Sequence, residues 1–248
     1  MQFDEKWDFV QKKERNCQPE EATAGDCWDH VALDPASRLV VSLVVGKRTA
    51  EATHELVADF RRRTGGRLPW LITSDEYAAY ADAIRTAYGQ VVTPPRTGRP
   101  GRPPNRTVVI PAGLTYATVH KHRANGRVVR VSTRLVFGTW FGLLLALAMS
   151  AVSRVVNAAF VERHNGTDRN RCSRKGRKRY QFSKDWDTHV AATRFSYFTY
   201  NFCWPVRTLR VKGEDGKWHP RSPAMAAGLT DHVWSIREWI TCPAVQRR

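Results

Sequence analysis

The chain has 248 residues, 42% of them hydrophobic, and carries 40 Lys and Arg against 23 Asp and Glu, a formal net charge of +17. This length and apolar content exclude a disordered chain and indicate one large or two small folded domains. So large a positive excess favours a polyanionic partner, with nucleic acid ahead of an anionic membrane surface or a merely solvated basic face.

The first 46 residues predict an antiparallel meander of three strands, because apolar and polar residues alternate and Asp34-Pro35 is a turn signal. An amphipathic helix capped by Thr49, a short buried strand and a second helix closed by Gly89 follow. The strands are expected at 2–12, 27–33, 38–46 and 68–74, and the helices at 49–63 and 76–89.

Composition then shifts to Pro, Gly and Arg at 93–106, which predicts an insertion or exposed loop without regular structure. Within it, 98–104 resembles in part a hook for the DNA minor groove, but a plain exposed loop is the preferred interpretation. The run 107–137 has β character, with Asn125-Gly126 as a hairpin turn. The remaining expected elements are a helix that carries Glu162, an aromatic-rich helix at 184–204, and two short helices after 206.

The stretch 135–153 carries no charged residue and just reaches the length of a membrane-spanning helix. A buried strand followed by a packed helix explains it equally well, and we therefore expect no membrane segment. The five scattered cysteines form no CxxC pair, so no zinc ribbon is supported and a reducing cytoplasm is indicated. Asp4 and Glu5 stand where a signal peptide would need basic and apolar residues.

Three carboxylates stand out by their places in these elements: Asp4 on the first strand, Asp75 at the end of the fourth, and Glu162 on a late helix beside a basic stretch. Carboxylates that converge from such positions can hold divalent metal ions for phosphodiester chemistry. Each has a simpler explanation. Glu5 and Asp8 compete with Asp4, Asp75 could cap the helix that follows it, and Glu162 could form a surface ion pair with its neighbour in sequence.

The segments DEKWDFV, TSDEYAAY, NAAFVERHNGTDRNR, QFSKDW and SPAMAAGLTDHVWSI resemble bacterial insertion-sequence transposases of the insertion sequence one family, over nearly the whole chain. The resemblance implies an α/β (α+β) chain with a ribonuclease H-like, mixed five-stranded sheet flanked by helices. It implies a catalytic domain at 1–205, with an insertion and hairpin at 93–127, and a C-terminal tail at 206–248.

The resemblance further implies a DDE-type DNA transposase, in which Asp4, Asp75 and Glu162 form the catalytic triad and hold two Mg²⁺ or Mn²⁺ ions. Strand cleavage would be followed by transfer of a 3′-OH end to target DNA. The implied partners are transposon ends, target DNA and a second copy of the chain, in the nucleoid of a bacterial cytoplasm. The N-terminal region by which such enzymes read the element's ends is expected on a separate polypeptide or lost by truncation.

Nine Arg or Lys lie between residues 163 and 184, next to the third carboxylate. A charge run is often only solvated, but its place beside a metal site favours contact with DNA phosphates. In the wider superfamily a basic residue often stands seven positions after the Glu. Arg169 occupies that position here and would share the helix face of Glu162, unless Gly166 and Asp168 end the helix early. The predicted DNA-binding residues are Arg163, Arg169, Arg171, Arg174, Lys175, Arg177 and Lys178.

Two other functions remain open from the sequence. A nuclease of the same fold would need the same carboxylates but would leave only cut ends, and an inactive transposase remnant would bind DNA without needing metal. His164 could assist at the site, although a surface histidine is the simpler expectation. His120 and His122 alternate on a strand and need no metal.

Overall fold

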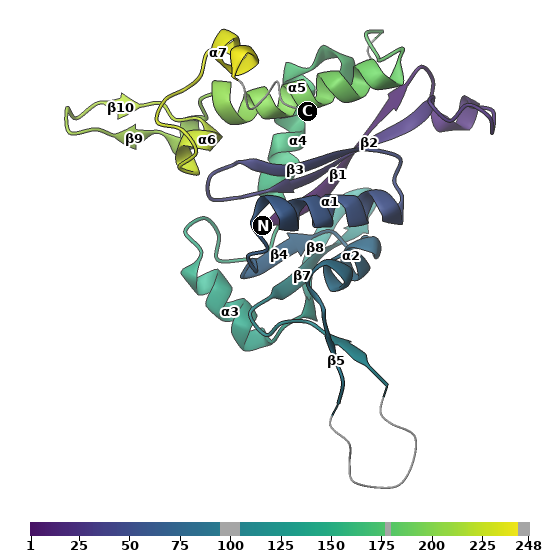
Figure 1. Cartoon of the computed structure of the whole chain (residues 1–248), viewed down its shortest axis with the longest axis vertical. Coiled ribbons are helices and arrows are strands. Elements are labelled where there is room, and N and C mark those ends of the chain that lie inside the picture. Colours follow the sequence, from purple (N-terminus) through teal and green to yellow (C-terminus); the bar gives the residue numbers. More distant parts are fainter. Residues whose placement is uncertain (95–104, 177–179, 243–248) are drawn as a thin grey trace, which may run out of the picture. The chain divides into compact units, whose positions relative to one another are not determined.

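The computed structural model describes residues 1–94, 105–176 and 180–242, and the chain divides into two compact units (Figure 1). The first unit comprises Met1 and residues 49–158, and the second comprises residues 2–48 and 159–248. The chain therefore leaves the second unit after its third strand and returns to it at the helix that carries Glu162. The predicted division at residue 205 stays a prediction.

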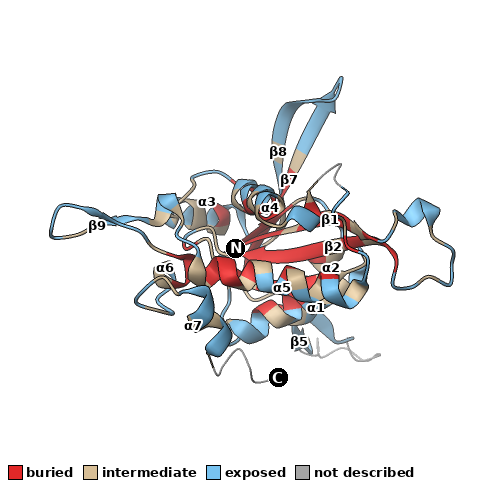
Figure 2. Cartoon of the chain, turned by 90° about the horizontal axis from the view of Figure 1, so that it is seen from above, coloured by how far each residue is buried: buried red, intermediate tan, exposed pale blue. Residues whose placement is uncertain are grey.

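The second unit begins with the predicted meander. Strands β1 (Gln2–Val10), β2 (Gly25–Leu33) and β3 (Val40–Gly46) pair in antiparallel fashion in the order β3-β2-β1. Asp34 accepts hydrogen bonds from the backbone N–H groups of Ala36 and Ser37, which forms the turn expected between β2 and β3. Figure 2 shows buried residues continuing along β1 and β2.

Helices α4 (Ala159–Arg171) and α5 (Trp186–Cys203) pack on this meander, α4 against β1 and β2 and α5 against β3 (Figure 1). Asp185 caps α5 by accepting from the N–H of Thr188 at 2.7 Å. The tail adds a ribbon of β9 (Val211–Lys212) and β10 (Trp218–His219), then α6 (Pro223–Ala226) and α7 (Ile236–Thr241), and both short helices pack on α5. Short 3-10 turns lie at Glu14–Asn16, Ser173–Lys175 and Arg207–Leu209.

The first unit contains helices α1 (Ala50–Arg63) and α2 (Ala79–Tyr88), which pack on each other, and strands β4 (Leu71–Ser74), β7 (Thr115–Ala124) and β8 (Arg127–Phe137). β4 and β7 are parallel, whereas β7 and β8 form an antiparallel hairpin. Thr49 caps α1 as predicted, by accepting from the N–H of Ala52. Helix α3 (Trp140–Met149) follows β8 and packs on β7.

Met1 adds one residue to the edge of β4. Its ammonium group donates to the carbonyl of Leu71 at 2.6 Å, and its carbonyl accepts from the N–H of Thr73 at 2.9 Å. These two bonds, one to each side of Ile72, have the pattern of a parallel pair. Met1 is therefore aligned with Ile72, in the same strand direction.

The mixed α/β class is confirmed, but the predicted count of five strands is wrong, because each unit holds three longer strands. The run 107–137, predicted to have β character with a turn at Asn125-Gly126, supplies two of these strands, because β8 pairs with β7 along its length. A two-stranded ribbon of β5 (Gln90–Val92) and β6 (Thr107–Val109) also brackets the insertion and was not predicted. The hook at 98–104 lies outside the described residues.

The uncharged stretch 135–153 contains the end of β8 and the ten-residue helix α3, and it is not one long helix. Among the described residues, no helix combines the length and the apolar character needed to cross a bilayer. The strand part of this stretch, 135–137, is half-buried. The far part of the β7–β8 hairpin, before the stretch begins, is exposed (Figure 2), with Val129 at 64%.

Candidate active site

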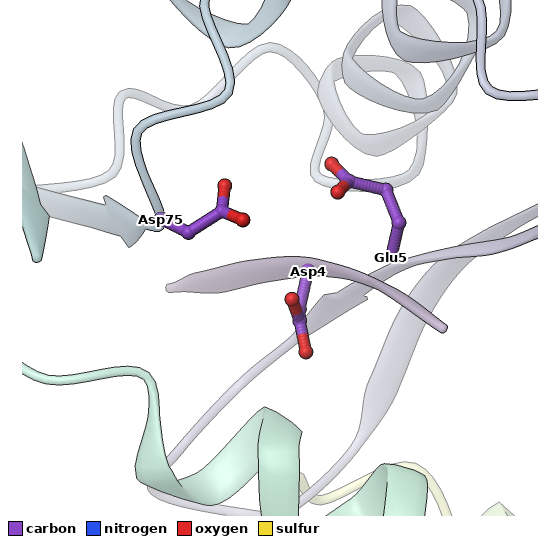
Figure 3. A group of neighbouring side chains, drawn as sticks. All are labelled: Asp4, Glu5 and Asp75. Carbon is purple, nitrogen blue, oxygen red and sulfur yellow. The ribbon is translucent and has the colours of Figure 1, made fainter. Parts of the chain in front are cut away.

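Strand β1 presents acidic residues on both of its faces. Asp4, Lys6 and Asp8 alternate on the face that meets α4, and Glu5 lies on the other. Figure 3 shows the side chains of Asp4 and Glu5 leaving opposite sides of the strand. Glu5 is buried, and its carboxylate lies 3.2 Å from the guanidinium of Arg48. Glu5 therefore already has a cationic partner, whereas Asp4 faces the helix that carries Glu162.

Helix α4 is aligned with β1 by polar contacts at successive levels. The side-chain oxygen of Gln2 accepts from the N–H groups of Phe160 and Val161, both at 3.0 Å, and so satisfies the first turn of the helix. One turn on, the amide of Asn165 donates to Asp4 Oδ2 at 2.7 Å. These bonds fix the position of α4 along β1 and the orientation of the Asp4 carboxylate.

Glu162 lies on α4 between these anchors and is exposed. It stands three residues before Asn165, and side chains at this spacing are neighbours on a helix surface. The structure thus brings Asp4 and the turn that carries Glu162 together within one unit. The helix continues through Gly166 to Arg171, although glycine costs roughly 1 kcal/mol there. The early helix end considered from the sequence does not occur.

Asp75 belongs to the first unit, where it directly follows the last residue of β4 (Figure 3). Its Oδ1 accepts from the N–H of Tyr77 at 3.0 Å. Helix α2 begins only at Ala79, and its N-cap residue Ala78 makes no side-chain cap. The simpler interpretation of Asp75 as a helix cap is therefore wrong: Asp75 shapes the turn between β4 and α2.

A small cavity opens beside this turn, with a volume of about 220 Å³. Ser74, immediately before Asp75, shares a 2.8 Å hydrogen bond with the hydroxyl of Tyr116, and Glu76 pairs with His120. His120 Nδ1 thus forms a hydrogen bond with the Glu76 carboxylate. The cavity is lined by Glu76, Tyr77, Ala78, Ala81, Tyr116, Thr118, Arg134 and Val136.

A group of four buried charges lies behind Asp4 in the second unit; we call it the buried quartet, and it consists of Lys6, Asp29, Asp168 and Lys175. The ammonium of Lys6 pairs with Asp168 and lies 2.9 Å from Asp29, while that of Lys175 lies 2.5 Å from Asp29 and 3.5 Å from Asp168. All four side chains are at most 2% exposed. Two positive and two negative charges compensate one another away from water.

The pKa values within the buried quartet follow from this balance. Burial alone would raise the pKa of Asp29, but the ammonium groups of Lys175 and Lys6 outweigh burial and hold it below its ordinary value. The pKa of Asp168 is lowered for the same reason. Burial would lower the pKa of Lys175, yet Asp29 and Asp168 raise it. All three groups therefore remain charged. Together with Lys6, they join α4 and the turn after it to β1 and β2.

The residues predicted to bind DNA fall into different environments. Arg163 and Arg174 are exposed, and the Arg171 guanidinium stacks 4.1 Å from the ring centroid of Trp204. Arg169 is half-buried, with its guanidinium 3.5 Å from the carbonyl of Trp7. Lys175 is 4% exposed and belongs to the buried quartet, so its ammonium does not reach the surface where DNA would lie. Arg177 and Lys178 lie outside the described residues.

Arg171 and Arg174 border an open groove between the end of α4 and α5. Ala191 and Ala192 form its floor on α5, where small side chains leave room above the helix. The groove has no carboxylate in its lining, which otherwise consists of Cys172, Ser173, Thr188, Phe195, Ser196 and Thr199. A groove with two arginines and hydroxyl groups is suited to an anionic chain.

His164 is not at the surface, contrary to expectation. It is 4% exposed and packs against the rings of Tyr197 and Tyr200, at 5.0 and 4.5 Å between centroids. Burial lowers the pKa of His164 to about 3, so the ring is neutral near pH 7. His164 is therefore a packing residue of α4 and does not face solvent beside Glu162.

No protein family, curated protein or solved structure matches this chain. The chemistry of the residues described above therefore carries the functional argument.

Proposed function

We propose that this protein is a metal-dependent DNA-cleaving and strand-transferring enzyme of the DDE transposase type, with a ribonuclease H-like core. Asp4, Asp75 and Glu162 would be its catalytic carboxylates. The observation that carries the proposal is the hydrogen bond from Asn165 to Asp4, which fixes the Asp4 carboxylate beside the helix that bears Glu162. Asp75 is proposed as the second carboxylate because it directly follows the last residue of β4 and does not cap the helix after it. Carboxylates that converge on one point are suited to share a metal ion.

Contacts within the second unit support Glu162 as the third carboxylate. Asn165 holds the Asp4 carboxylate, and Glu162 stands one turn earlier on the same helix. Gln2 fixes the start of that helix through two backbone hydrogen bonds. Glu162 is exposed, as a residue that meets both metal and DNA must be.

Asp4, Asp75 and Glu162 fit Mg²⁺ or Mn²⁺ because these ions prefer hard carboxylate oxygens. Two such ions would supply activation of water or a DNA 3′-OH and stabilisation of the leaving oxygen. The chain's own part is to hold its carboxylates in place. The hydrogen bond from Asn165 does this for Asp4, and the Tyr77 N–H does it for Asp75.

DNA is the proposed partner because the net charge is +17 and exposed arginines lie on and just after the helix of Glu162. Arg163 and Arg174 would contact phosphates directly, and Arg171 would do so from its stacked position beside the groove. Lys175 is left out of this surface.

The test is nicking of supercoiled plasmid by the purified chain with Mg²⁺ or Mn²⁺, compared with Asp4→Asn, Asp75→Asn and Glu162→Gln. Each variant should lose about a hundredfold or more in rate, because each removes an interaction made in the transition state. Glu55→Gln, an exposed carboxylate on α1, serves as the matched control and should match the parent. Nicking that persists with a chelator, or in Asp75→Asn, would contradict the proposal.

The DNA products of the reaction distinguish an enzyme that performs strand transfer from one that only cleaves. A transposase should join a labelled 3′-OH oligonucleotide to a second duplex in the same metal-containing buffer. Nicked ends without joined product, lost in the three carboxylate variants, would indicate a nuclease built on the same site. Binding of DNA with no metal-dependent product would indicate an inactive remnant.

A further inference from the structure

Helix α3 has two apolar faces, and only one of them is packed against the rest of its unit. Its inner side packs on β7 in a small core that includes Leu143, Leu147 and Val119. Its other side is exposed, with Phe141 at 77% and Leu144 at 63%. We call this side the α3 outer face; it consists of Trp140, Phe141, Leu144, Leu145, Ala148 and Met149.

The α3 outer face is a continuous stripe and not a scatter of single apolar residues. Its members recur at spacings of three and four residues, which places them in adjacent rows along the helix. The stretch from residue 135 to residue 153 contains no charged side chain that could solvate the stripe. Such a contiguous apolar surface marks an interaction site.

We propose that the α3 outer face is an interface between two copies of this chain. With roughly 200 Å² for a fully exposed aromatic side chain and roughly 120 Å² for Leu or Met, the exposed fractions of the five large side chains give on the order of 500 Å² per copy. Two copies would bury about 1,000 Å² in total, roughly the area that a biological interface should clear, which corresponds to a weak and concentration-dependent dimer.

The chemistry of the face favours a second copy over other occupants. A membrane-surface helix carries basic residues along its polar side, but α3 has none, and at ten residues it spans only about 15 Å. A different protein would usually be selected by complementary charge, which this face does not offer. The face is complementary to itself, because Phe141, Leu145 and Met149 follow one another at intervals of four residues.

A two-fold axis beside Leu145 would set two α3 helices antiparallel. Leu145 would then meet its own copy, and Phe141 of each chain would meet Met149 of the other. This arrangement fills both ends of the stripe without any charged partner. The inference depends only on α3 and holds whether or not the protein acts on DNA.

The first test measures the association state of the full chain by sedimentation, without DNA or metal. High ionic strength is used, so that repulsion between two strongly basic copies is screened. We expect a concentration-dependent dimer whose dissociation constant rises about tenfold or more in Phe141→Glu and in Leu144→Glu. Val129→Glu is the matched control, because Val129 is 64% exposed, like Leu144, but lies on β8; it should leave the dimer unchanged.

The second test identifies what covers the face. A photo-crosslinker replaces Phe141 in a mixture of isotope-labelled and unlabelled chains, and mass spectrometry locates the linked peptides. Mixed-isotope links between two α3 peptides are expected. A monomer at every concentration, equal losses in Val129→Glu, or links only within one chain would overturn the proposal. So would recovery of a monomeric chain on neutral phosphatidylcholine vesicles, because the face would then bind lipid.

Discussion

Asn165 donates a hydrogen bond to the Asp4 carboxylate at 2.7 Å, across a separation of 161 residues in sequence. An amide donor of this kind fixes a carboxylate without neutralising it. It leaves the negative charge of Asp4 available to a cation and restricts the rotation of its side chain.

Asn165→Ala should therefore weaken metal binding while the carboxylates themselves are kept. Loss of an outer contact to a metal ligand typically raises the metal concentration needed by 10–100-fold, and we expect an increase of about that size in Mn²⁺-dependent nicking. Asn170→Ala, on the exposed side of the same helix, is the control and should titrate like the parent. Equal metal requirements for the two variants would remove Asn165 from the site.

Lys175→Met should destabilise the fold strongly. It removes one of the two cations of the buried quartet, and breaking a buried ion pair costs about 3–5 kcal/mol in the free energy of unfolding. Urea unfolding measures the loss. Lys217→Met, an exposed lysine near β10, should stay within about 0.5 kcal/mol of the parent.

The double variant Lys175→Met/Asp29→Asn keeps the charges of the quartet balanced. It should recover part of the stability lost in Lys175→Met, because no carboxylate is left uncompensated. A double variant that is less stable than Lys175→Met would mean that the remaining contacts of Asp29, with Lys6 and the Tyr197 hydroxyl, matter more than the surplus charge.

Asp8 should make stability depend on pH in the acid range. Burial raises the pKa of the Asp8 carboxyl from 3.8 to about 6 in the folded protein. The protonated form is thus favoured by folding, so the contribution of Asp8 is most favourable below about pH 4 and is lost as the pH rises through about 6. Asp8→Asn should gain on the order of 2 kcal/mol at neutral pH and nothing below about pH 4.

Urea unfolding at several pH values tests this, with Glu20→Gln as an exposed control that should show no pH-dependent gain. A gain in Asp8→Asn that is equal at all pH values would show that the effect is not caused by titration of the carboxyl.

The exposed arginines of the proposed DNA-binding surface should each contribute to DNA affinity. Arg163→Ser and Arg174→Ser should each weaken binding to any sequence and lower the slope of log affinity against log salt by about 0.9. Fluorescence anisotropy with a labelled duplex measures both quantities. Arg67→Ser, an exposed arginine after α1, is the control. An unchanged slope in all variants would show that this part of the chain does not contact phosphates.

The strands and turns were predictable where the local pattern alone decides the structure. Alternation in residues 2–12 predicted β1, and Asn125-Gly126 predicted the β7–β8 turn, where both residues adopt positive φ of 49° and 74°. Gly89 does follow α2, but in an extended conformation. A side chain there would collide with the carbonyl of Arg85 and with Val108, a close approach between segments that the sequence could not reveal.

The inner face of α4 was harder to predict because it is polar. Val161, His164, Asn165 and Asp168 have the three- and four-residue spacing of a buried face, yet three of the four are polar. Hydrophobic periodicity therefore gave no signal, and His164 was expected at the surface. The strand alternation predicts that Lys6 shares the face of Asp4, but its burial depends on Asp29 and Asp168, which are brought near only by the tertiary fold.

The buried quartet also constrains how this sequence can change over generations. A lineage that exchanges Lys175 for a neutral residue would retain a surplus negative charge in its interior until a second substitution removed it. Positions 6, 29, 168 and 175 should accordingly vary together among descendants of this chain, as intact sets of two acids and two bases or as wholly uncharged replacements. Intermediate combinations should be rare.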